Sequence, residues 1–255
     1  MNQWLGRMLL GPGPGLATYT GPGGHSDQHA HHAVQFGVAL DEPLRVTIGT
    51  MSLTATAVLI PPDVPHSFAV NGRVLFLWVD PHGPRGHRLK EHATRLIGRD
   101  LALHLRGLGE IASGAGLSTD LVRALLAAIS GEFDELPKQP SPPVAAAVAY
   151  VESAIERGDA ERRAPSLDEA ARAAGVSPSR LTHVFTAEVG IPFRRYVLWV
   201  RLMRAIRAIA AGNDVTRAAG DAGFSDSAHL SRTFRRIFGL PPSLLLAIDL
   251  VEQSW

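Results

Sequence analysis

Histidines gather in the first half of this chain at spacings that could bind a metal ion. Nine of the eleven histidines lie in the first 104 residues. His29 and His31 are two residues apart, so on a strand they share one face and His32 takes the other. His66 follows a proline-rich turn at residues 61–65. Neutral imidazoles are good ligands for Zn²⁺, Ni²⁺ and similar cations, so these histidines are candidate metal ligands.

Arginines gather in the second half. Between Ser177 and Gly239 there are ten arginines, no lysine and four acidic residues, a local charge of 10 − 4 = +6 in a chain whose net charge is only +1. A local positive excess suits a polyanion such as nucleic acid. We therefore expect the two halves to perform different chemistry.

The arginine-rich half contains an internal repeat. A pattern of alanines, apolar anchors, glycine and proline between residues 170 and 192 recurs between residues 218 and 241. Its pairs include Leu181 with Leu230, Phe185 with Phe234, and Gly190 with Gly239. Each copy predicts a short helix, a glycine turn and a second helix with apolar anchors four residues apart, which is the pattern of a helix-turn-helix.

Periodicity and capping signals place the elements of this half. Helices are predicted over 144–157, 167–174, 178–189, 192–211, 215–222 and 226–238, with no strand among them. Ser166 with Glu169 forms a capping box, and Gly190 and Gly239 are stop signals. The helix over 192–211 is about 30 Å long, close to the roughly 34 Å between successive major-groove faces of B-DNA. Its five arginines could either reach phosphates or form a solvated face.

The first half has a different organisation. Short strands are predicted over 34–40, 44–48, 56–60 and 74–79, with a hairpin turn at Asn71-Gly72, which favours an antiparallel sandwich or small barrel. The pattern turns helical after Pro84, and a helix over 119–130 could pair subunits or pack on its own barrel.

A proline-rich break separates the halves. It divides the chain into a domain at 1–136, a linker at 137–143 and a helical domain at 144–255. The fold class is α+β with two domains. The chain has no cysteine, so disulfides and thiolate metal sites are excluded. No apolar run approaches the roughly 18 residues of a membrane helix, so we expect a cytoplasmic protein.

Residues 144 to 246 resemble the DNA-binding domain of AraC/XylS-type transcription regulators. The second unit reads Gly223-Phe224-Ser225, then Phe234-Arg235-Arg236-Ile237-Phe238-Gly239 and Pro241, as in that family. Leu230 stands where many members have phenylalanine. The resemblance implies an all-α domain in which two helix-turn-helix units are joined by a long helix. It implies base contacts from Ser179, Arg180, Thr182 and His183 in the first unit, and from Ser227, Ala228, Ser231, Arg232 and Arg235 in the second.

The histidine segment resembles the cupin pattern, which implies a small antiparallel β-barrel that holds a metal or ligand. The family's first motif, His-x-His-x-x-x-Glu, reads His29 to Gln35 here, so glutamine replaces the acid. The second motif ends in His66 and has Asp63 in place of the family's glycine. The implied site is His29, His31, Gln35 and His66. Replacing a carboxylate by an amide removes a charge that favours a metal, so an organic effector remains the alternative to Zn²⁺ or Ni²⁺.

Together these patterns predict a regulator that binds promoter DNA and senses a small-molecule or metal effector, and that is not an enzyme. A homodimer is expected, with RNA polymerase as a further partner and no membrane partner. The alternative is a metal-dependent cupin enzyme, an isomerase or dioxygenase, with a DNA-binding appendage. Gln35 argues against it, as does the lack of an obvious acid/base pair beside the histidines.

Overall fold

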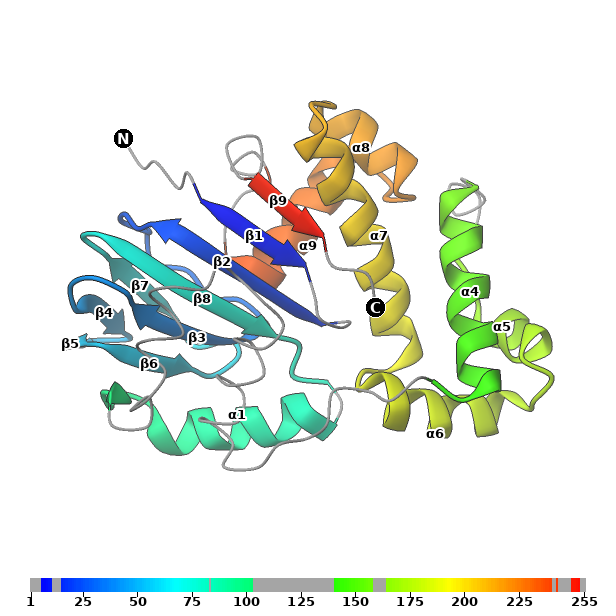
Figure 1. Ribbon diagram of the computed structural model, residues 1–255, viewed down its shortest axis with the longest axis horizontal. Coiled ribbons are helices and arrows are strands. Elements are labelled where there is room, and N and C mark those ends of the chain that lie inside the picture. Colours follow the sequence, from blue (N-terminus) through cyan, green and yellow to red (C-terminus); the bar gives the residue numbers. More distant parts are fainter. Residues whose placement is uncertain are drawn as a thin grey trace.

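The protein combines an N-terminal domain of two β-sheets with a helical C-terminal domain (Figure 1). It is seen here in a computed structural model that describes residues 6–10, 15–82, 84–102, 140–157, 164–239, 242 and 249–252. The helix predicted over 119–130 lies outside these ranges, as do residues 137–139 of the predicted linker. Among the described helices, none has the length and apolar character that a membrane span needs.

The larger sheet has six strands and the smaller has three. The six lie in the order β6 (Ala57–Ile60), β3 (Val34–Ala39), β8 (Arg73–Val79), β2 (Leu16–Pro22), β1 (Arg7–Leu10) and β9 (Asp249–Glu252). The three are β5 (Met51–Ala55), β4 (Leu44–Ile48) and β7 (His66–Ala69). All pairs are antiparallel except β1 with β9, which is parallel.

The two sheets do not close into the predicted cupin-like barrel. The segment before β3 pairs with β7 through isolated bridges at His25 and His29 and through a hydrogen bond from the N–H of Ser26 to the carbonyl of Phe68, but it forms no regular strand there. The predicted hairpin at Asn71-Gly72 is also wrong, because this turn joins β7 to β8, which belong to different sheets. The N-terminal domain is thus an open sandwich within the described residues.

Alternation along β8 explains how the large sheet is covered on both faces. Val74, Phe76 and Trp78 face the smaller sheet, and the residues between them pack on the opposite side. That opposite side is covered by helix α1 (Pro84–Leu96), whose Leu89 and Ala93 are buried against it. The sandwich interior is covered partly by the small sheet and partly by the C-terminal helices (Figure 1).

The helices of the C-terminal domain agree closely with the predicted segments. They are α4 (Pro142–Glu156), α5 (Leu167–Ala173), α6 (Pro178–Val189), α7 (Phe193–Ala210), α8 (Val215–Asp221) and α9 (Ser227–Phe238). The capping box at Ser166 and the left-handed glycine caps at Gly190 and Gly239 are all present. The sequence predicts no strand after residue 143, and β9 shows this to be wrong. Four residues are too few for an alternating pattern, and pairing with β1 supplies the hydrogen bonds.

The last turn of α9 joins the two domains. The Phe238 ring packs edge-on against Trp78 of β8, at 5.7 Å between ring centroids, and both side chains are almost fully buried. Nearby, Arg195 at the start of α7 donates two hydrogen bonds to the carboxylate of Asp80, which follows β8. One continuous apolar cluster therefore includes residues of both sheets and of α7, α8 and α9.

We expect Phe238→Ala to lower the free energy of unfolding by about 3–5 kcal/mol, because it opens a cavity where the two domains share their core. Denaturation in urea measures this. The matched control is Val189→Ala, the equivalent position at the end of α6, which packs within the C-terminal domain. A loss for Phe238→Ala no larger than that of the control would contradict the shared core.

Candidate functional sites: a histidine cluster and two exposed helices

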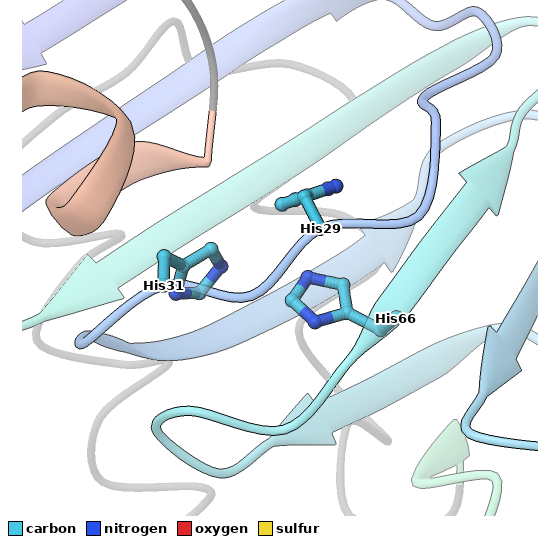
Figure 2. Close-up of side chains that lie close together, drawn as sticks. All are labelled: His29, His31 and His66. Carbon is cyan, nitrogen blue, oxygen red and sulfur yellow. The ribbon is translucent and has the colours of Figure 1, made fainter. Parts of the chain in front are cut away.

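Three predicted histidines meet between the two sheets (Figure 2). His29 and His31 come from the segment before β3, and His66 begins β7. One ring nitrogen from each lies within 4.8 Å of the others, and the rings of His29 and His66 are 4.5 Å apart between centroids. His31 and His66 are buried and His29 is half-buried. We call these residues, with the buried Gln35, the histidine site.

Backbone carbonyls orient all three imidazole rings. Nδ1 of His29 lies 2.8 Å from the carbonyl of Asp27, Nδ1 of His31 lies 3.1 Å from that of Ala33, and Nδ1 of His66 lies 2.8 Å from that of Val64. A carbonyl only accepts, so each contact holds the proton on Nδ1 and leaves the Nε2 lone pair free. Metal-binding histidines in proteins are commonly oriented in this way. The donor set therefore fits a divalent cation.

Gln35 lies between the two buried rings. Its Oε1 is 2.8 Å from Nε2 of His31 and 3.0 Å from Nε2 of His66. Both Nε2 atoms carry lone pairs, and an amide oxygen can only accept hydrogen bonds. These three atoms are therefore favourable neighbours only if a cation lies between them. Without a cation, the amide must rotate to present its NH₂ group, which can donate to both rings. The orientation of the Gln35 amide therefore depends on whether a cation lies between it and the two rings.

Burial keeps two of the histidines neutral. Desolvation lowers the pKa of His31 to about 4, with a smaller contribution from the charge of His29, while the hydrogen bond to Gln35 acts in the opposite direction. Desolvation, followed by the charges of His31 and His29, lowers the pKa of His66 to about 3. Near neutral pH both rings are therefore unprotonated, as metal ligands must be.

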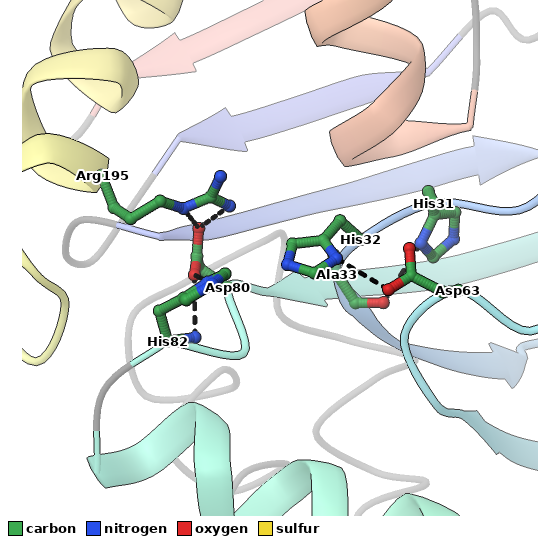
Figure 3. A network of polar contacts seen from close by, with 7 residues as sticks. All are labelled: His31, His32, Ala33, Asp63, Asp80, His82 and Arg195. Carbon is green, nitrogen blue, oxygen red and sulfur yellow. Dashed lines mark hydrogen bonds and ion pairs between the residues drawn. The ribbon is translucent and has the colours of Figure 1, made fainter.

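His32 faces away from the site, as the two-residue period predicts. Its Nδ1 lies 2.8 Å from a carboxylate oxygen of Asp63, and its ring lies 4.9 Å from that of His82 (Figure 3). Asp63 occupies the cupin glycine position at a φ of 61°, a left-handed conformation that aspartate tolerates better than most residues. The segment before His66 can therefore form this turn although it lacks the glycine of the cupin pattern.

The predicted base-reading residues lie on α6 and α9. The α6 set is exposed and comprises Ser179, Arg180, Thr182 and His183. On α9, Ala228, Arg232 and Arg235 are exposed, whereas Ser227 and Ser231 are half-buried. The opposite faces are buried through the repeated pairs Leu181 with Leu230 and Phe185 with Phe234. Each exposed helix is the second of a helix pair, α5–α6 or α8–α9.

Some of these side chains are already constrained. The Thr182 hydroxyl donates to the carbonyl of Pro178, which leaves only its acceptor capacity for a base edge. Arg232 is exposed on α9, and its charge, after the hydrogen bonds from the backbone of His229 and from Ser225, helps to lower the pKa of the Asp226 carboxyl. On α7, Arg195 pairs with Asp80, and Arg201 donates to the carbonyl of Ala222. These two arginines of the long helix therefore support the fold.

Residues 170–247 match the family model described as a helix-turn-helix domain. This segment is thus an AraC-type helix-turn-helix domain. This membership points to a DNA-binding transcription regulator rather than to an enzyme.

Several solved structures are similar to the chain. The C-terminal domain of AraT from Geobacillus stearothermophilus is 22% identical, with 42% of this chain and 86% of that chain covered and a TM-score of 0.37. An AraC-type regulator from Chromobacterium violaceum is 29% identical, with coverage of 42% and 90% and a TM-score of 0.37. ToxT from Vibrio cholerae is 12% identical, with coverage of 91% and 98% and a TM-score of 0.47.

The sequence could not indicate which parts of the C-terminal domain touch the histidine site. Gly239 is identifiable as a helix stop signal, but its contact with His29 and His31 has no local signal. The same is true of the pair between Asp80 and Arg195, which are 115 residues apart. Only the packing of the two domains brings these residues together.

We expect the metal-free protein to lose stability as the pH falls below about 6.5. Unfolded histidines take up a proton there, whereas folded His31 and His66 stay neutral down to about pH 4 and about pH 3. In that window the unfolded state binds more protons, so the free energy of unfolding rises with pH by about 1.4 kcal/mol per pH unit for each histidine. Urea denaturation across the window, with chelator present, measures the slope. A His31→Gln, His66→Gln double variant should be less pH-dependent, and an unchanged slope would contradict the assignment.

Proposed function

We propose that this protein is an effector-responsive transcription regulator that reads promoter DNA with two helix-turn-helix units, α5–α6 and α8–α9. The single observation that carries the proposal is the match over residues 170–247, which covers most of both helix pairs. The exposed polar faces of α6 and α9 support it, because major-groove reading requires such a face on the second helix of each unit. The 18 residues of α7 make a rod about 27 Å long that joins the two units.

Arg232 is the strongest candidate for base reading. Its side chain is exposed on α9, and arginine can bond O6 and N7 of one guanine together. The proposed contacts from α6 are Ser179, Arg180, Thr182 and His183, and those from α9 are Ser227, Ala228, Ser231, Arg232 and Arg235. Because alanine offers only a methyl contact and serine and threonine are permissive, sequence preference would rest on few positions and on DNA shape.

We also propose that the histidine site is the sensor and that it takes a borderline divalent cation such as Zn²⁺ or Ni²⁺. His29, His31 and His66 would hold the ion through Nε2, with the Gln35 oxygen directed toward it. The three carbonyl-oriented rings and the neutrality of His31 and His66 support this. The ion would supply positive charge that draws the imidazoles together. The alternative effector is a polar organic molecule in the same place.

We propose further partners and a location from the proposed role on DNA. Regulation at promoters implies a cytoplasmic protein that acts beside RNA polymerase. A homodimer would allow operators made of repeated sites. The helix over 119–130, which the sequence suggests for pairing, lies outside the described residues.

Selection from a random duplex pool tests the DNA-reading proposal. The full-length protein is used at roughly 150 mM salt, where non-specific phosphate binding is suppressed. We expect enrichment of two conserved blocks about 10 base pairs apart, one helical turn. Selection is done with chelator and again with Zn²⁺ or Ni²⁺. Failure to enrich any motif in all conditions would overturn the proposal.

We expect Arg232→Ala to weaken binding to the selected duplex by about 1–3 kcal/mol and to relax preference at one base pair. Fluorescence anisotropy with the selected duplex and with single-base variants measures both effects. Arg99→Ala, which removes an equal charge from an exposed position after α1, is the control. If Arg232→Ala weakens binding to all sequences equally, Arg232 contacts phosphate and does not read bases.

We expect Gln35→Glu to tighten Zn²⁺ binding by about 10-fold or more, because it restores a carboxylate beside the imidazoles. Isothermal titration of the chelator-treated protein with Zn²⁺ measures this. His66→Ala should abolish binding at the site, and His87→Ala, which is exposed on α1, is the control. If the native protein and Gln35→Glu both fail to retain Zn²⁺ at micromolar concentrations, the metal proposal is wrong and an organic effector takes its place.

A further inference from the structure

A cleft lies between α4 and α7, two helices of the C-terminal domain that contact each other (Figure 1). Its volume is about 420 Å³, which is within the size range of small-molecule sites. None of the residues that line it belongs to the histidine site. We call it the α4–α7 cleft. Four of its lining residues are charged, and they are Glu152 and Glu156 of α4 and Arg204 and Arg207 of α7.

Buried apolar side chains also line the α4–α7 cleft, and they come from two different cores. Trp199 and Met203 belong to the core that the two domains share. Ile155 and Tyr196 belong to the core around α4, α5 and α6. The cleft therefore lies where the two cores meet. Aromatic rings and a methionine side chain offer a surface on which a large hydrocarbon group can pack.

Arg204 provides the clearest signal for a bound anion. Its Nη1 is buried and has no hydrogen-bond partner within the described residues. A buried donor without a partner costs free energy, so such groups are normally satisfied by protein, water or a ligand. Two other arginines of α7 are satisfied, because Arg195 pairs with Asp80 and Arg201 donates to the carbonyl of Ala222. A carboxylate suits Arg204, since a guanidinium can bind it through two parallel hydrogen bonds.

The α4 side of the cleft suits a cation. Glu152 is half-buried and accepts a hydrogen bond of 3.0 Å from the hydroxyl of Tyr196. Burial, together with the charge of Glu152, raises the pKa of Tyr196, so this hydroxyl stays protonated and keeps donating. A carboxylate has about four acceptor positions, so Glu152 can also accept from a ligand. Glu156 follows one turn later on α4 and is exposed. An ammonium group in the cleft would thus have two carboxylates nearby.

We infer that the α4–α7 cleft binds a free amino acid with a large apolar side chain. The ligand's carboxylate would bind Arg204, its ammonium group would bind Glu152 and Glu156, and its side chain would pack on Trp199. A simple anion would bring a like charge toward the α4 carboxylates, which is unfavourable. A simple cation would leave the buried Arg204 donor unsatisfied. A zwitterion matches the charges of both helices.

The location of the cleft gives this ligand a possible role in regulation. The α4 helix packs in one core with α5 and α6, and α7 joins this first helix pair to the second. An amino acid in the cleft would bridge α4 and α7, and so contact the connection between the two proposed reading units. The regulatory role rests on the proposed function, whereas binding in the cleft does not.

Isothermal titration of the full-length protein, without DNA and with chelator present, tests the site. The probe is L-phenylalanine, and L-leucine beside it separates an aromatic from a branched side chain. Two further ligands keep the ring but lose one charge, because 3-phenylpropionate lacks the ammonium group and 2-phenylethylamine lacks the carboxylate. We expect at least one amino acid to bind at millimolar concentrations or below, and L-phenylalanine to bind at least about 10-fold more tightly than either single-charge ligand if it is the preferred one. Absence of binding by both amino acids overturns the inference, as does equal binding of 3-phenylpropionate and L-phenylalanine.

Variants assign the two charges to their partners. Arg204→Met should lower the affinity for the preferred amino acid by at least about 10-fold and leave the affinity for 2-phenylethylamine unchanged. Glu156→Gln should weaken binding of the amino acid and of 2-phenylethylamine alike. Arg194→Met, on the exposed side of α7 and outside the cleft, is the matched control.

Two further measurements separate this site from the fold and from the histidine site. In urea denaturation, Arg204→Met should keep the native free energy of unfolding, because it removes a donor that has no partner. His66→Ala should bind the amino acid as the native protein does. Binding to Arg204→Met as tight as binding to the Arg194→Met control overturns the inference, as does loss of binding in His66→Ala. None of these outcomes depends on whether the protein reads DNA.

Discussion

The packing of the last turn of α9 into the open side of the β-sandwich is the interaction on which the rest of the structure depends. The two sheets do not close into a barrel, and the C-terminal helices cover part of their shared interior. Phe238, Ile237 and Phe234 supply the missing apolar surface, and Trp78 receives Phe238. Burying this surface is favourable for both domains at once. The sheets and the helices therefore share a single core.

That shared core sets the chemistry of the histidine site. With α9 in place, His31 and His66 lie almost out of contact with water, and desolvation holds them neutral. Neutral rings whose Nδ1 groups donate to backbone carbonyls keep their Nε2 lone pairs for a ligand. A site of this kind can accept a cation or the NH₂ group of Gln35. The same burial that favours the fold thus prepares the site for a ligand.

The repeat in the C-terminal domain is symmetric in sequence and asymmetric in its surroundings. Leu181 and Phe185 bury α6 just as Leu230 and Phe234 bury α9, and both helices end at a left-handed glycine. The end of α6 packs within its own domain, at Val189, whereas the end of α9 packs on the N-terminal domain, at Phe238. The two copies of the repeat therefore differ in what the ends of α6 and α9 contact.

The sequence by itself determined the helices of the C-terminal domain and several of the strands, because these depend on local periodicity and capping. The grouping of His66 and Gln35 with His29 and His31 followed from the resemblance to the cupin pattern. Ser166, Gly190 and Gly239 marked helix ends that the structure keeps. Only the tertiary structure decided that the sandwich stays open, that β9 returns to β1, and that Gly239 touches His29. These features join residues far apart in the chain, and their energies come from burial and pairing between elements, which no local pattern records.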